Sequence, residues 1–290
     1  MAKVRVAIAH AGIHDPSIFY LSLLARNLER DLPDGKVETI SHYQILQGEL
    51  RDYGVVIFPG GLSSILAPSI HGDKFIEIVQ DFVAKGGGFV GSCGGAYAAA
   101  VEIASIESSL STSFMKSLFR AGKRIFGEAV PSLKTMKLAN VIAYWPNLFS
   151  WIKIAPLELL SLRSLPVPYR SANFEVAEQA HPIIHGHEKE NLKITYSGGA
   201  ILDKAGEGIT PLVSYDTNAF MPEAYKKLAV VCTTYGNGRV VLSGPHPELP
   251  PIIRPPYLKA SQKWLYVRMI TWAVGSISAE VNKMDKKAIM

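Results

Sequence analysis

Hydrophobic and polar positions follow two alternating periods along the first hundred residues. Short apolar runs of strand length are separated by amphipathic stretches of helical length. The apolar runs are VRVAIAH (4–10), KVETIS (36–41), GVVIFPGG (54–61) and GFVGSC (88–93), and the stretches between them include 16–32 and 73–87. Because strands that alternate with helices form parallel sheets covered on both sides, the pattern predicts an α/β fold. We expect a flavodoxin-like, doubly wound, mostly parallel sheet with helices on both faces.

The pattern changes over residues 104–170. This segment is rich in Leu, Ile, Phe, Trp and Ser, and Gly122 and Gly127 are its only glycines. We expect a helical insertion or cap at about 104–170 within a single domain that spans residues 1–290. Its aromatic stretch YWPNLFSWI would pack on the body of the domain or form the interface of a homo-oligomer.

Strand patterns return in the last third of the chain. The segments LKITYSGGAIL (192–202), GITPLVSYD (208–216) and KLAVVCTTYGNGRVVLSGPHPE (227–248) are apolar runs bounded by turn residues. The Gly236-Asn237 pair in the last segment predicts a hairpin turn. A final helix is expected over about 257–275.

Composition narrows the classes of partner. Hydrophobic residues make up 48% and charged residues 19% of the chain, which is typical of a packed globular protein. The net charge of +5 is small for 290 residues, so no nucleic-acid partner is expected. The most apolar internal segment, 138–162, is interrupted by proline, asparagine and lysine, so no membrane span is predicted.

The two cysteines differ in their surroundings. They provide no disulfide framework, which favours a reducing, cytoplasmic setting. Cys93 lies in GSCGG, between an apolar run and a helical pattern, where the helix N-terminus would favour a thiolate. Gly91, Gly94 and Gly95 would allow the sharp turn of a nucleophile elbow, although a small core residue in a Gly-rich bend is an equal alternative. Cys232, within LAVVC, is expected in the core.

A nucleophilic thiol needs a base. Among the eight histidines, His246 in SGPHPE follows a predicted strand, and Glu248 two residues later can orient its imidazole. His181, His185 and His187 cluster in a loop segment, where surface histidines are a simpler interpretation than a metal site. We therefore expect no metal and no organic cofactor.

The ordered motifs FPGG, GSCGGAY and SGPHPE resemble the class I glutamine amidotransferase superfamily. The branch they resemble most is typified by the N-terminal domain of biotin-protein ligases. The resemblance implies that Cys93 is the nucleophile, His246 the general base and later acid, and Glu248 the orienting carboxylate. It also implies an oxyanion hole made by the backbone amides of Gly61 and Gly94.

Four residues are expected at a substrate pocket. Gly60 stands in FPGG beside the implied oxyanion hole, and Ser197 and Gly198 end a predicted strand. Tyr97 occupies the elbow position where glutaminases of this superfamily usually carry a glutamine that helps to form the glutamine pocket. This difference argues against glutamine as the substrate.

Three functions remain open at this point. The first is a cysteine-dependent hydrolase or amidotransferase-like enzyme that acts on a small-molecule or peptide amide. The second is a non-catalytic binding or regulatory module that partners a ligase or synthase, since the sequence carries no G-x-x-x-x-G-K-[ST] loop. The third is a DJ-1/PfpI-like cysteine protein, although many of those place a histidine directly after the cysteine, where this chain has Gly94.

Overall fold

A computed structural model describes most of the chain. The residues it describes are 4–12, 15, 18–32, 35–105, 133–145, 170–216, 224, 226–248 and 262–275.

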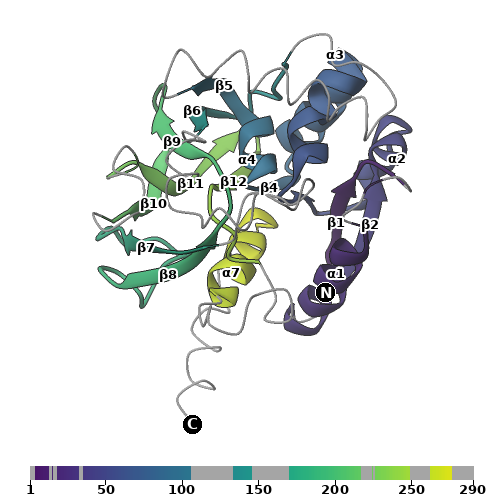
Figure 1. Cartoon of the computed structure of the whole chain (residues 1–290). Helices are drawn as coiled ribbons and strands as arrows, with labels where there is room; N and C mark the ends of the chain where they lie inside the picture. The colour runs from purple at the N-terminus through teal and green to yellow at the C-terminus, as the bar shows by residue number, and fades with distance from the viewer. Residues whose placement is uncertain are drawn as a thin grey trace, which may run out of the picture.

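Five parallel strands form one half of the sheet (Figure 1). In spatial order they are β2 (Gly35–Ser41), β1 (Val4–His10), β3 (Val55–Phe58), β4 (Gly88–Ser92) and β12 (Gly238–Ser243). Each pairs in parallel with its neighbour. This is the 2-1-3-4-5 order of flavodoxin-like sheets, in which ligands bind beyond the carboxyl ends of the strands.

The other half of the sheet is antiparallel. From β12 it continues through β11 (Leu228–Tyr235), β10 (Thr210–Tyr215), β7 (Arg170–Val176) and β8 (Asn191–Tyr196). A branch leaves β11 through β9 (Ile201–Lys204) to β6 (Ala139–Trp145) and β5 (Ala100–Ser105). The predicted hairpin joins β11 to β12, because Tyr235 pairs with Gly238 across a two-residue loop.

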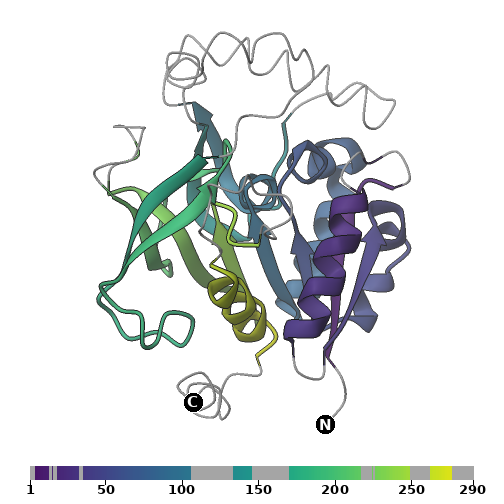
Figure 2. The same ribbon diagram turned by 60° about the horizontal axis from the view of Figure 1, so that its bottom comes forward.

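Helices cover both faces of the parallel half. On one face lie α1 (Ile18–Asp31) and α7 (Lys263–Ala273), which stand side by side in Figure 2. The other face carries α2 (His42–Leu46), α3 (Leu62–Ala84) and α4 (Gly94–Ala99), with a short 3-10 helix at Glu49–Asp52. Each face of the sheet has its own hydrophobic core, and alternate residues of β1 enter the two. Val6 and Ile8 belong to the core that α1 covers, and Ala7 and Ala9 belong to the core that α3 covers. The predicted fold class is confirmed.

Two details differ from the sequence prediction. Residues 139–145 lie in the expected helical insertion but form strand β6, because their alternating buried positions pair with β9. The helical pattern expected after Cys93 also stops early: α4 ends at Ala99, and strand β5 begins at the next residue. The remaining parts of the insertion, 106–132 and 146–169, lie outside the described residues, and the single-domain organisation stays a prediction.

The predicted last helix corresponds to α7, which begins at Lys263; residues 249–261 lie outside the described part. Among the helices that the structure describes, none has both the length and the apolar character to cross a membrane.

The first residue of α2 is a fully buried histidine. The His42 ring stacks on Phe58 at 6.0 Å between centroids and meets His71 and Phe75 edge-on at 5.3 and 5.4 Å. Burial, with a smaller contribution from the charge of His71, lowers the pKa of His42 to about 3. The fold therefore requires a neutral imidazole at this position.

This requirement predicts an acid-sensitive stability. The unfolded chain binds a proton at His42 below pH 6.5 while the folded chain does not, so the free energy of unfolding falls as the pH decreases from 6.5 toward 3. From pH 7 to pH 5 we expect the wild type to lose about 2 kcal/mol more than His42→Phe, measured by urea unfolding with far-UV circular dichroism. His185→Phe, at an exposed histidine, is the control and should follow the wild type. Parallel curves for the wild type and His42→Phe would contradict this account.

Candidate active site

Cys93 sits on a strained turn between β4 and α4. Its backbone angles are φ 47° and ψ −100°, a conformation that side chains rarely adopt. Hydrogen bonds hold both sides of the turn: Cys93 N donates to Ser243 O at 2.7 Å, and Cys93 O accepts from Ala96 N at 3.1 Å and Tyr97 N at 3.3 Å. The turn has the strand-turn-helix order that a nucleophile elbow requires, and its role as an elbow stays a prediction.

Glycines allow the Cys93 turn to lie directly on the end of β3. A Cβ on Gly94 would stand 2.1 Å from Gly61 O, and one on Gly95 would stand 2.0 Å from Phe58 O. Only glycine fits at either position. The main chains of Gly61 and Gly94 are thus in contact, as an oxyanion hole made from both would require, and that role stays a prediction.

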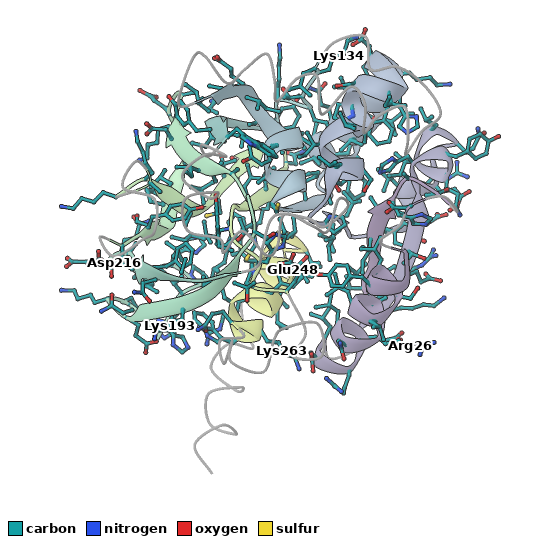
Figure 3. The ribbon with its side chains drawn as sticks, in the orientation of Figure 1. Arg26, Lys134, Lys193, Asp216, Glu248 and Lys263 are labelled. Atoms are coloured by element: carbon teal, nitrogen blue, oxygen red, sulfur yellow. The ribbon has the colours of Figure 1, made fainter. Side chains whose placement is uncertain are left out.

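The loop after β12 brings His246 and Glu248 to the same place. His246 N donates to Thr195 O at 2.7 Å, and His246 Nδ1 lies 2.8 Å from Glu248 Oε1. The Glu248 side chain is completely buried and lies in the middle of the molecule beside α7 in Figure 3. Since Glu248 occupies Nδ1, the other ring nitrogen of His246 is left for a different partner.

That partner is Cys93. A Cβ on Gly60 would stand 2.4 Å from His246 Cε1 and 3.4 Å from Cys93 Cβ, so the imidazole and the thiol converge over this glycine. Burial on its own would lower the pKa of His246, but the Cys93 sulfur and the Glu248 carboxylate, both in hydrogen-bonding contact, raise that pKa well above 6.5. The arrangement can hold a thiolate, an imidazolium and a carboxylate in line.

The turn between β8 and β9 also contacts Cys93 and the helix that follows it. Cys93 Sγ donates to Ser197 O at 3.8 Å, and Tyr97 Oη donates to Gly198 O at 3.2 Å. The four residues predicted at a substrate pocket, namely Gly60, Tyr97, Ser197 and Gly198, therefore all lie around Cys93 or its immediate neighbours. Their contact with a substrate stays a prediction.

Three further residues hold this turn: Gly199 and Tyr196, which the sequence indicated only as part of the stretch TYSGGA, and Tyr215, which it did not indicate. A Cβ on Gly199 would stand 1.7 Å from Gly244 O, so the two turns touch through their main chains. Tyr196 Oη and Tyr215 Oη donate to Gly199 O at 2.7 Å and Ala200 O at 3.1 Å. The one available signal was the SGG sequence that follows Tyr196, whereas nothing in the chain spacing links Tyr215 to the site.

The other cysteine and the histidine cluster have separate surroundings. Cys232 is buried in β11, as predicted, and burial raises its pKa to about 12. Its sulfur lies 3.3 Å from His181 Nε2. His181 and His187 are half-buried, with His187 stacked on Trp264, and His185 is exposed as expected of a surface histidine. Within the described ranges, no group of three or more His, Cys, Asp or Glu residues could hold a metal ion.

Solved structures of known proteins share this fold. One is a chain of PurLQS from Thermotoga maritima, with 14% identity, coverage of 93% of this chain and 99% of the other, and a TM-score of 0.54. Another is a ThuA-like protein from Bacteroides uniformis, with 12% identity, coverage of 96% and 93%, and a TM-score of 0.50. At such identities the likeness concerns the fold alone.

The shared fold agrees with the resemblance to the class I glutamine amidotransferase-like superfamily that the ordered motifs indicate. Within it, the resemblance to the biotin-protein ligase branch is also confirmed, because the family described as "Biotin-protein ligase, N terminal" matches residues 169–271. This match contains the SGPHPE motif and the Ser197 turn. No curated protein matches the sequence.

The raised pKa of His246 gives a testable pH dependence. Because this pKa lies above the unfolded value of about 6.5, the contacts of His246 with Cys93 and Glu248 stabilise the fold fully below pH 6.5, and this stabilisation is lost as the pH rises through the folded pKa. Glu248→Gln should lower the pKa of His246, measured by NMR titration of histidine-labelled protein with His246→Asn to assign the signal.

The control is Glu190→Gln, which removes the exposed carboxylate 3.0 Å from His187 Nδ1 and should leave the His246 titration unchanged. A His246 signal that titrates at or below pH 6.5 in the wild type would refute the paired arrangement.

Proposed function

We propose that this protein is a Cys-His-Glu hydrolase or amidotransferase-like enzyme that cleaves an amide carbon–nitrogen bond through a covalent thioester. The observation that carries the proposal is the convergence of the Cys93 thiol and the His246 imidazole over Gly60, with His246 Nδ1 2.8 Å from Glu248 Oε1. A strained elbow, a base and a buried orienting carboxylate are the three parts of an activated nucleophile.

The chemistry follows from these positions. His246 takes the proton of the Cys93 thiol, and the sulfur attacks the amide carbon. The backbone amides of Gly61 and Gly94 donate to the oxyanion that forms. The carbon–nitrogen bond then breaks, His246 returns the proton to the leaving amine, and a thioester on Cys93 remains. A water molecule, deprotonated by His246, hydrolyses the thioester and restores the thiol.

The substrate class is a small-molecule or peptide amide. Glutamine is not the substrate that we favour, because Tyr97 replaces the glutamine of typical glutaminases and its hydroxyl is bound to Gly198 O. An ammonia acceptor would be provided by a synthase or ligase partner, and the fold shared with the PurLQS chain agrees with this inference. Both cysteines are free thiols, which supports a cytoplasmic setting.

A non-catalytic module that partners such a ligase or synthase is the second candidate. The buried, hydrogen-bonded Tyr97 favours it, because this residue fills space beside the elbow. A module of this kind would keep the fold and the contacts around Cys93 without turnover.

Turnover of amides separates the two candidates. The wild type should release ammonia or amine from at least one member of a panel of primary and peptide amides, and Cys93→Ala should lower kcat/KM by about 10³-fold or more because the nucleophile is lost. Cys232→Ala removes the other thiol and should retain activity. Equal background rates for the wild type and Cys93→Ala across the panel would contradict the enzyme proposal and favour the module.

A further inference from the structure

Three buried tyrosines bind three consecutive carbonyl groups of the turn between β8 and β9. Tyr97 Oη lies 3.2 Å from Gly198 O, Tyr196 Oη 2.7 Å from Gly199 O, and Tyr215 Oη 3.1 Å from Ala200 O. We call these three residues the tyrosine clamp. They come from α4, β8 and β10, and each is at most 1% exposed.

The clamp leaves the turn little freedom to move. A shift of the turn would leave buried hydroxyls and buried carbonyls without partners, which is unfavourable. The contact between Gly199 and Gly244 adds a second restraint, because the two main chains already touch. The residue just before the clamped carbonyls is Ser197, so its own carbonyl is held in place as well.

The Ser197 carbonyl and His246 are alternative partners of one sulfur. A carbonyl oxygen accepts hydrogen bonds and cannot donate them, so Ser197 O, 3.8 Å from Cys93 Sγ, can bind only the neutral thiol. His246 binds the sulfur most strongly when the proton has moved from Sγ to the imidazole, which forms a thiolate and an imidazolium. The position of the Ser197 carbonyl therefore decides how strongly the thiol form is favoured.

We propose that the tyrosine clamp is a positioning device that fixes Ser197 O as the acceptor of the resting Cys93 thiol and thereby sets the pH at which the thiolate–imidazolium pair forms. The proposal rests on the proposed function of the Cys93 site. Tyr97, Tyr196 and Tyr215 are positioning residues in it, since they act through the main chain of the turn.

The described titratable groups that face Cys93 are of two kinds. The titratable groups that face the thiol are His246 and the three clamp tyrosines. Burial, with smaller contributions from neighbouring groups, raises the pKa of each tyrosine well above 10, so their hydroxyls stay neutral through the range of the test. A shifted profile between pH 5 and 9 therefore reports the thiol and its imidazole partner.

The test is the pH profile of Cys93 alkylation by iodoacetamide, followed by mass spectrometry in a Cys232→Ala background. Tyr97→Phe removes the hydroxyl that holds Gly198, which weakens the acceptor of the neutral thiol. We expect the profile to move to lower pH, so that alkylation below the wild-type midpoint becomes about threefold faster. Tyr215→Phe removes the hydroxyl that binds Ala200 O, three residues from Ser197. It should give a smaller shift in the same direction.

A purely structural role of the clamp predicts a different result for Tyr97→Phe. If the clamp were only structural, its loss would leave the profile unchanged or move it to higher pH. An upward shift or an unchanged profile in Tyr97→Phe overturns the proposal, and Tyr196→Phe provides the same comparison if Tyr97→Phe does not fold. Tyr53→Phe, at a tyrosine that contacts Arg5 away from the site, is the control and should match the wild type.

One further variant separates the two proposals. If His246→Asn leaves the profile unchanged, the triad itself is refuted and the clamp proposal falls with it. If His246→Asn changes the profile but the clamp variants do not, the clamp proposal alone is refuted.

Discussion

Direct contact between main chains is the constraint on which this site depends. The carboxyl ends of β3, β4 and β12 and the turn after β8 meet with no side chain between their closest points. Gly94 lies against Gly61 O, and Gly199 lies against Gly244 O. A single added Cβ at these positions would push two of the segments apart. The close approach lets side chains from distant parts of the sequence, such as Cys93, share one small volume.

The electrostatics of the site follow from this close packing. Little water can reach the Cys93 thiol or the His246 imidazole, each 8% exposed, so their charges are not screened as they would be at a surface. Under these conditions the sulfur and the Glu248 carboxylate overcome the effect of burial on the His246 pKa. His42 shows the contrasting case: it is buried among aromatic rings, and its pKa falls to about 3. Burial lowers the pKa at both histidines, but at His246 the hydrogen-bonded sulfur and carboxylate outweigh it, whereas at His42 burial is the largest effect.

The sequence predicted the parts of the protein that depend on local pattern. The parallel strands and their helices follow from periodicity, and Cys93 and His246 stand in motifs whose residue order is specific. The strand at 139–145 could not be predicted, because its pairing with β9 joins segments about 60 residues apart. Tyr215 was missed for the same reason: its role depends on an Ala200 carbonyl that only the folded sheet brings within reach.

The central claim is that Cys93 forms a covalent thioester with an amide substrate. The most direct measurement is intact-protein and peptide mass spectrometry after rapid acid quench of the protein with a turned-over amide. The account predicts an acyl adduct on the Cys93 peptide that hydroxylamine removes and that Cys93→Ala lacks. Turnover without any adduct on Cys93, or an adduct that forms equally on Cys232, would contradict it.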